Sequence, residues 1–313
     1  MCAASIYETL VSDPSAVLPD QGDLPSDSVG VWVPGAYEGT LLRTKKKIAK
    51  NSWINHGVVR DVRRFALDPS EGKMKAVEKS FSTYTAIALT DPVLSIMSGM
   101  KLPADKLHDA AVALATKSGK REAVKFSIAL LADQRSRVEG STDADAEIIK
   151  TLSLCEEFTL FGAVALKNIL PKEKADAVLL ELAGRLSGWG KLALMYELDY
   201  TLPEVRDFAL CRGCRNTVGL PYLANVCAIK GKMRDYLAGL EESGAAIDEE
   251  HFTGIIDIFT GLLTDDPTND GIFEYPDAKE SARLFRAIVA RSSDSVKNRA
   301  VDVLKGLHVK RIG

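Results

Sequence analysis

The sequence predicts an all-α fold, a right-handed α-solenoid of stacked helical pairs that begins with an irregular N-terminal cap. The first observation is a recurring tripeptide in which Ile, Val or Leu precedes Ala-Leu. Its copies end at Leu89, Leu130, Leu166 and Leu194, so they lie 41, 36 and 28 residues apart. Recurrence on this scale is typical of helical repeats, in which each pair of helices packs mainly against its neighbours.

The second observation is a set of segments that are apolar on every side. Between Trp189 and Leu198 only Lys191 and Glu197 are charged, and the run from Phe158 to Leu166 carries no charge. A helix of this kind must be covered on all sides, and adjacent repeats supply the cover. Glycine and proline positions then predict helices over residues 103–117, 120–132, 143–154, 158–170, 172–186 and 189–198.

The N-terminal region differs from the repeats in composition. Residues 1–39 contain six acidic residues, no Lys or Arg, and four prolines, which predicts one short helix followed by loop. We therefore place an irregular cap at residues 1–50 and one elongated repeat domain at residues 51–313. The first residues lack the basic and apolar regions of a signal peptide, and the longest uncharged apolar run is too short for a membrane helix.

A basic segment follows the acidic one. Residues 40–80 contain eleven basic and four acidic residues, although the whole chain has a net charge of −3. A stripe of apolar residues at helical spacing predicts a helix over residues 53–67, with Arg60, Arg63 and Arg64 on another face. These arginines either bind phosphates or an acidic partner, or they pair with the acidic residues of the first 39 positions.

Two segments resemble a known repeat. The runs Pro203 to Leu210 (PEVRDFAL) and Asp294 to Ala300 (DSVKNRA) are similar to the helix with the pattern D-x-V-R-x-x-A-x-x-x-L in HEAT and armadillo-like repeats. The resemblance extends over about residues 100–310. It implies an α-solenoid with a concave binding surface, and it implies no catalytic residue.

The cysteines predict reduced thiols in a cytoplasmic protein. There are five in 313 residues, an odd and sparse set for a disulfide scaffold. Cys211 and Cys214 have CxxC spacing, but no histidine is near them in sequence, and Cys211 falls at the end of a predicted helix with Gly213 as its C-cap residue. We expect buried thiols here, and neither a metal site nor a cofactor.

Two loops contain polar residues with more than one interpretation. After Cys214, a helix is predicted to begin with Asn216 or Thr217 as its N-cap, and Arg212 and Arg215 flank an end that could bind an anion. Capping alone also explains the Asn and the Thr. Residues 266–277 have the oxygen spacing of a calcium loop, although prolines intrude and an ordinary exposed loop has the same composition.

The sequence contains no recognisable catalytic constellation. Its four histidines are scattered, and none is placed beside a nucleophile. The favoured hypothesis is a non-catalytic cytoplasmic protein that binds a protein or peptide on its concave face. The alternative is a nucleic-acid binder or a HEAT-like DNA-repair glycosylase that uses the basic segment 43–79; the oligomeric state is left open. The candidate binding residues are Trp53, Arg60, Arg63, Arg64, Arg212, Arg215, Asn216 and Tyr222.

Overall fold

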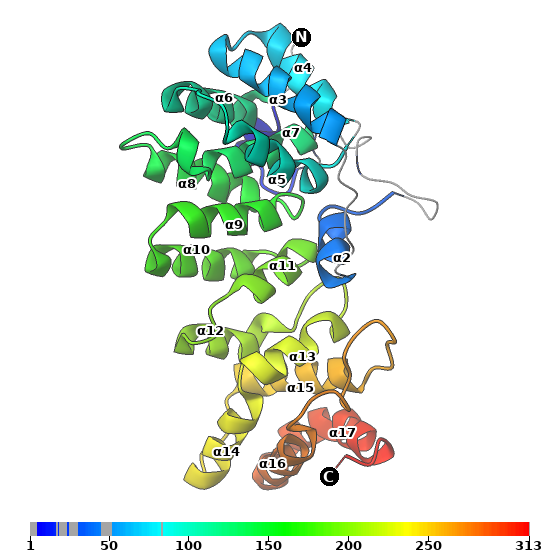
Figure 1. Cartoon of the computed structure of the whole chain (residues 1–313). Helices are drawn as coiled ribbons and strands as arrows, with labels where there is room; N and C mark the ends of the chain where they lie inside the picture. The colour runs from blue at the N-terminus through cyan, green and yellow to red at the C-terminus, as the bar shows by residue number, and fades with distance from the viewer. Residues whose placement is uncertain are drawn as a thin grey trace. The chain divides into compact units, whose positions relative to one another are not determined.

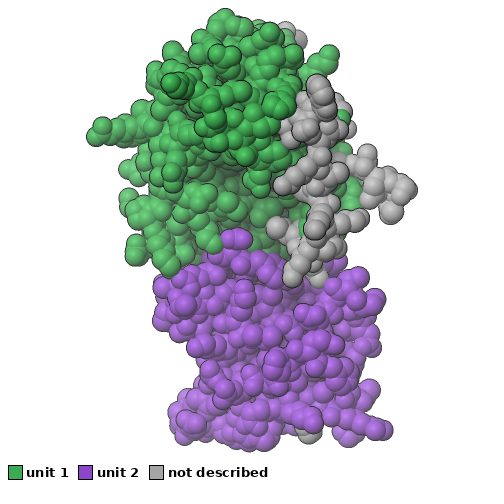
Figure 2. Space-filling model, viewed as in Figure 1, with its two compact units in different colours: residues 1–194 green, residues 195–313 purple. Residues whose placement is uncertain are grey.

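The computed structural model describes residues 5–16, 18, 24, 31–44, 52–82 and 84–312. Within these residues the chain is built from helices and loops without a β-strand, so the all-α prediction is confirmed (Figure 1). The chain divides into two compact units, Met1–Leu194 and Met195–Gly313 (Figure 2). No helix in the described ranges is both long enough and apolar enough to cross a membrane.

Unit 1 is an assembly of helices that pack in two layers. Contacts link α3 to α5, α5 to α7 and α7 to α9, while α6 contacts both α7 and α8, and α8 contacts α9. Helices α3, α5, α7 and α9 therefore form one layer of alternate helices, and α6 and α8 lie beside it. The helices of this part are α3 (Ser52–Leu67), α4 (Glu71–Ser82), α5 (Ala86–Met97), α6 (Ala104–Lys117), α7 (Arg121–Leu131), α8 (Thr142–Ser153), α9 (Thr159–Ile169), α10 (Lys172–Arg185) and the first six residues of α11 (Trp189–Glu197).

Helix α7 is the centre of the core of unit 1. Phe126, Ile128 and Leu130 are buried, and even Lys125 is inaccessible to solvent. The helix contacts α4, α5, α6 and α9. Helix α7 is thus covered by its neighbours on nearly all sides, although it contains Arg121, Glu122 and Lys125.

The N-terminal segment packs along the helices of unit 1. Helix α1 (Ile6–Ser12) contacts α6 and α8, and the Ile6 amide donates a hydrogen bond to the Ser118 carbonyl at 3.0 Å. Helix α2 (Ala36–Thr44) begins after Gly35, which has a φ of +76°. A Cβ atom on Gly35 would lie 2.5 Å from the Glu156 carbonyl oxygen, so only glycine fits. The predicted boundary at residue 50 therefore lies within unit 1.

Unit 2 is organised around α15 (Glu249–Leu263). This helix contacts α13, α17 and a π-helical turn over Ala209–Gly213. At Gly254 a Cβ atom would lie 1.9 Å from the Leu210 carbonyl oxygen, so the missing side chain lets α15 approach the π-helical turn backbone to backbone. The remaining helices are α12 (Pro203–Phe208), α13 (Pro221–Lys230), α14 (Met233–Ser243), α16 (Ala278–Arg291) and α17 (Asp294–Val309).

The prediction that Gly213 is the C-cap residue of a helix is wrong, because Cys214 takes that position. Gly213 lies inside the π-helical turn and is not among the residues with positive φ. It is needed for space, because a Cβ atom there would lie 2.7 Å from Cε of Met195 and 3.1 Å from Sγ of Cys227. Cys211, Cys214 and Cys227 are buried free thiols, as the sequence predicts.

Candidate functional site

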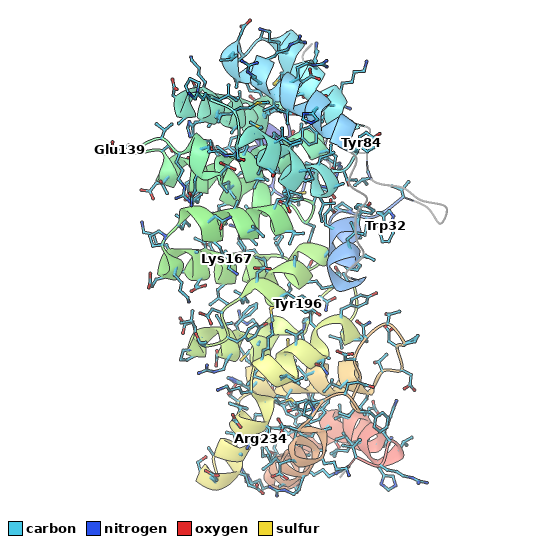
Figure 3. All side chains as sticks on the ribbon, viewed as in Figure 1. Trp32, Tyr84, Glu139, Lys167, Tyr196 and Arg234 are labelled. Carbon is cyan, nitrogen blue, oxygen red and sulfur yellow. The ribbon has the colours of Figure 1, made fainter. Side chains whose placement is uncertain are left out.

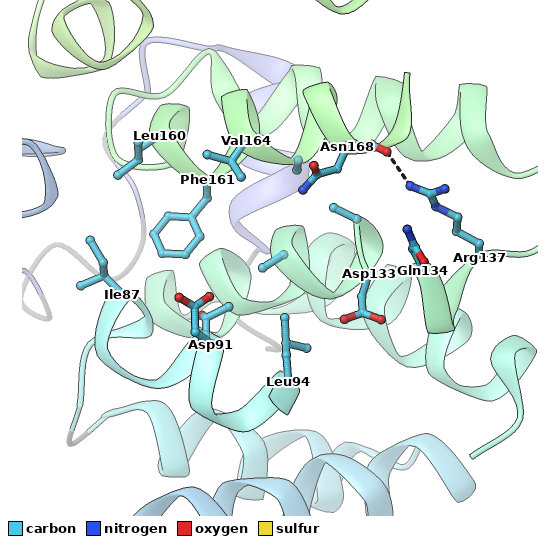
Figure 4. A pocket seen from close by; sticks show the side chains of 14 residues that line it. Ile87, Asp91, Leu94, Asp133, Gln134, Arg137, Leu160, Phe161, Val164 and Asn168 are labelled. Carbon is cyan, nitrogen blue, oxygen red and sulfur yellow. Dashed lines mark hydrogen bonds between the residues drawn. The ribbon is translucent and has the colours of Figure 1, made fainter. Parts of the chain in front are cut away.

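The first candidate site is a groove in unit 1 between α5, α7 and α9 (Figure 4). Its volume is about 590 Å³, within the range of roughly 300 to 1,000 Å³ that is usual for ligand sites. It lies over the layer of alternate helices described above. Its lining residues are Ile87, Thr90, Asp91, Leu94, Ala129, Ala132, Asp133, Gln134, Arg137, Leu160, Phe161, Val164, Ala165 and Asn168.

One end of this groove is apolar. Figure 4 shows Ile87 of α5 facing Leu160 and Phe161 of α9, with Val164 beside them. Val164 is 46% exposed although α9 is otherwise rich in buried apolar residues. An exposed apolar wall inside a concave site gains free energy when an apolar group covers it.

Thr90 gives the groove an unsatisfied polar group. Its side chain is only 6% exposed, and its hydroxyl has no hydrogen-bond partner in the described part of the chain. A buried hydroxyl without a partner costs about 1 to 3 kcal/mol, so a bound group that hydrogen-bonds to it recovers that free energy. The next residue, Asp91, is exposed at the groove and has no ion pair among the described residues.

The other end of the groove is polar and fixed by arginines. Arg135 donates from Nε to Asp133 at 2.6 Å and from Nη1 to the Leu94 carbonyl at 2.8 Å, which ties the end of α5 to the loop after α7. Burial alone would raise the pKa of Asp133, but the hydrogen bonds from Arg135 outweigh burial and lower it. Arg137 donates to the Asn168 carbonyl across the groove (Figure 4). Asp133 is therefore ionised and paired with Arg135. Asp91 and Arg137, the other charged residues of the lining, form no ion pair within the described part of the chain.

The candidate arginines of the basic segment lie elsewhere, on α3. Arg60, Arg63 and Arg64 are exposed, and Arg60 contacts Asp61 with its Nε at 3.0 Å. None of the three lines the groove. The side chain of Trp53 lies outside the described residues.

The other predicted binding residues lie in unit 2, and two of them, Arg212 and Arg215, form ion pairs with acidic residues of α15. Arg212 contacts Glu250 at 2.7 Å, and Arg215 contacts Asp257 at 2.8 Å. Tyr222 is half-buried on α13, and Tyr196, labelled in Figure 3, is 43% exposed. Both ion pairs connect the segment around the π-helical turn to α15.

The prediction that Asn216 or Thr217 caps a helix is wrong. Helix α13 begins at Pro221, with Leu220 at the N-cap position. The Asn216 side chain instead shapes the loop, because Oδ1 accepts from the amides of Val218 and Gly219 at 2.9 and 2.7 Å. Its Nδ2 donates to the carbonyls of Cys214 and Gly219. Asn216 thus provides hydrogen-bond partners for backbone groups of the loop that lie outside the helices.

Two groups of metal-ligand type are found among the described residues. The first, Glu38, Glu122 and Glu157, is in unit 1, and the second, Asp207, Cys211 and His251, is in unit 2. In each group the ligand atoms lie within 4.8 Å of one another. The first group surrounds the Lys125 ammonium, which lies 2.5 Å from Glu38, 2.7 Å from Glu122 and 2.5 Å from Glu157.

The loop over residues 266–277 uses its oxygen atoms internally. Asp266 Oδ1 accepts from the Thr268 amide at 2.8 Å, and its Oδ2 accepts from Asn269 at 2.8 Å. Glu274 accepts from the Gly271 amide at 2.9 Å. These are the hydrogen bonds of an ordinary polar loop.

Sequence reasoning missed the groove and the group around Cys211 and His251. The groove is built from short stretches of three helices, and the sequence gives no signal for it. The prediction that the run 158–166 is covered on all sides is wrong at Val164, which is 46% exposed. Cys211 and His251 are 40 residues apart and meet only through the close approach at Gly254.

Comparison with known proteins adds no assignment. Protein-family models, curated proteins and solved structures all give no match to this chain.

Proposed function

We propose that this chain is a non-catalytic helical-repeat protein, of the α-solenoid type, that binds a protein or peptide partner in the groove between α5, α7 and α9. The observation that carries the proposal is the groove of about 590 Å³ with an unsatisfied, buried Thr90 hydroxyl in its wall. An α-solenoid presents an extended concave surface for binding, and in this proposal the groove belongs to that surface. The free thiols of the described cysteines support a reducing, cytoplasmic location.

The groove favours a segment that combines apolar side chains with a basic one. The ring of Phe161 and the carboxylate of Asp91 face each other across the cavity in Figure 4. An Arg or Lys side chain between them would gain both a cation–π contact and an ion pair. Neighbouring apolar residues of the same segment would cover Val164 and Leu160, and Thr90 would hydrogen-bond to the segment's backbone.

Selection from a random peptide library tests this function directly. The full chain is immobilised, bound peptides are selected, and their affinities are measured for the parent and for Val164→Arg. We expect Val164→Arg to weaken peptide binding by roughly tenfold or more. The new guanidinium would lose water when a peptide covers it beside Phe161, and the peptide would lose its apolar contact with Val164.

Val301→Arg is the matched control. Val301 is 37% exposed on α17 in unit 2, so the substitution adds the same charge to an exposed helical valine outside the groove. Its peptide affinities should equal those of the parent. If no peptide is selected, or if both variants bind equally, the proposal fails.

Nucleic-acid binding through the basic segment 43–79 is the second candidate function. Its support is the exposure of Arg60, Arg63 and Arg64 together on α3. Their contribution would be electrostatic, so binding should weaken steeply as salt increases. A gel-shift titration at low ionic strength with DNA and RNA tests it, with Arg63→Glu as the variant. Absence of a shift removes this candidate and leaves the peptide proposal untouched.

A further inference from the structure

The second group of ligand-type residues combines three kinds of side chain in one place. Asp207 belongs to α12, Cys211 to the π-helical turn four residues later, and His251 to the first turn of α15. Asp207 Oδ1 lies 3.1 Å from His251 Nε2, and the ligand atoms of all three lie within 4.8 Å of one another. Tetrahedral zinc, with bonds of about 2.0 to 2.3 Å, holds its ligand atoms roughly 3.3 to 3.8 Å apart.

The imidazole of His251 is held in a fixed orientation. Asp248, the N-cap residue of α15, contacts Nδ1 through Oδ2 at 2.8 Å and accepts from the His251 amide through Oδ1 at 3.0 Å. The Tyr236 ring stacks on the imidazole with centroids 4.5 Å apart and planes at 13°. Nε2 therefore points toward Asp207, and the carboxylate on the opposite nitrogen is the arrangement found behind zinc-bound histidines.

The surroundings of the group are acidic. Asp207, Asp248 and Glu250 lie around the Cys211 sulfur. Their negative charges favour a divalent cation. Arg212 opposes them, but it is paired with Glu250. The group differs in this way from the three glutamates of unit 1, whose centre is taken by an ammonium.

We propose that Asp207, Cys211 and His251 bind one zinc ion, with Asp248 as the positioning residue for His251. The ligands would be one carboxylate oxygen, Sγ and Nε2, and a water molecule would complete four-coordination. Binding replaces by the metal the proton on Cys211 and the proton that Nε2 of His251 shares with Asp207, so protons are released to water and affinity rises with pH. Asp207 is 65% exposed, which gives the ion a path from solvent.

Metal titration of the full chain tests the proposal. The protein is stripped with a chelator under reducing conditions, and Zn²⁺ binding is measured by competition with a chromogenic chelator. Co²⁺ provides a spectroscopic probe, because coordination by a thiolate gives a sulfur-to-metal charge-transfer band. We expect one Zn²⁺ per chain, the charge-transfer band, and an unfolding midpoint that rises when Zn²⁺ is added.

Substitutions then assign the ligands. Cys211→Ser should remove the charge-transfer band and lower affinity by about 100-fold or more, while Asp248→Asn should lower affinity by roughly 10-fold to 100-fold. Cys214→Ser is the matched control, because Cys214 is a buried thiol of the same segment outside the group, and it should leave both readouts unchanged. Asp207→Asn, at an exposed position, keeps the test valid if a buried substitution prevents folding.

Three results would overturn the proposal. They are the absence of stoichiometric Zn²⁺ binding by the folded parent, a charge-transfer band that survives Cys211→Ser, or equal losses in Cys211→Ser and Cys214→Ser. A normal helical circular dichroism spectrum is required of each variant before its affinity is interpreted.

Discussion

The glutamate group of unit 1 and the mixed group of unit 2 place ligand atoms at similar separations but differ in what balances their charge. Glu38, Glu122 and Glu157 enclose a side chain of this chain, Lys125, whose exposed fraction is zero. Among the described residues, the group of Asp207, Cys211 and His251 is not centred on a lysine or arginine, and Asp207 pairs instead with His251, a member of the group. Proximity of ligand atoms alone therefore does not define a metal site. A site also requires that no internal cation already occupies its centre.

The glutamate group has a structural task. The Gly35 amide donates to Glu157 at 2.9 Å, and Glu38 of α2 contacts Lys125 of α7, so the group fastens the N-terminal segment to the core. Burial would lower the pKa of Lys125, but Glu122, Glu38 and Glu157 outweigh burial and raise it above its ordinary value. Lys125 is therefore charged at neutral pH, and its removal leaves buried carboxylates without their cation.

Lys125→Met should have the largest effect on stability. A buried ion pair that loses one partner costs about 3 to 5 kcal/mol in free energy of unfolding, because the remaining charges stay desolvated. Urea unfolding followed by circular dichroism measures this change. Lys150→Met, which removes an exposed pair with Glu181, should cost no more than about 1 kcal/mol. Equal losses in the two variants would show that the glutamate group does not need its internal cation.

Glu38→Gln should have an intermediate effect that depends on pH. At neutral pH it should cost about 1 to 3 kcal/mol, the value of a hydrogen bond to a charged group. Burial, the largest influence, raises the pKa of Glu38 above its unfolded value of about 4.3. The folded chain therefore holds a proton that the unfolded chain has released, and this stabilisation is complete below the unfolded pKa and is lost as pH rises through the folded pKa.

The parent should thus gain stability relative to Glu38→Gln as pH falls from 7 toward 4. Urea unfolding at several pH values measures the difference. Glu181→Gln, at a side chain that is 45% exposed, is the control and should show no such trend. A parent that loses stability relative to Glu38→Gln over this range would mean that the ion pair with Lys125, and not burial, sets the pKa of Glu38.

The helices could be predicted because their signals are local. The expected helix over 103–117 is observed as Ala104–Lys117, and the one over 120–132 as Arg121–Leu131. The division into two units carries no such signal, since it falls between Leu194 and Met195, inside one continuous apolar helix. Contacts between distant segments decide where a unit ends, and hydrophobic periodicity does not record them.

The sites were harder to predict for a related reason. The CxxC spacing drew attention to Cys214, whereas the structure places Cys211 beside His251 and leaves Cys214 outside the group. Gly254 is visible in the sequence, but the carbonyl of Leu210 that it contacts is not. Likewise, the sequence around Lys125 does not distinguish it from a lysine on a solvent-exposed helix face. Nothing near Lys125 in the sequence indicates that it forms ion pairs with Glu38 and Glu157.

His251→Ala should have the smallest effect on the metal-free protein. The imidazole contributes its stacking on Tyr236 and its contacts with Asp207 and Asp248, whose side chains are 65% and 58% exposed, and these interactions together are worth about 1 kcal/mol or less. The acids that remain stay in contact with water, in contrast to the glutamates around Lys125. Urea unfolding in the presence of a chelator measures this loss, and the same experiment with Zn²⁺ should show that the variant no longer gains stability from the metal. A loss of 3 kcal/mol or more without metal would mean that His251, like Lys125, serves mainly as an internal cation.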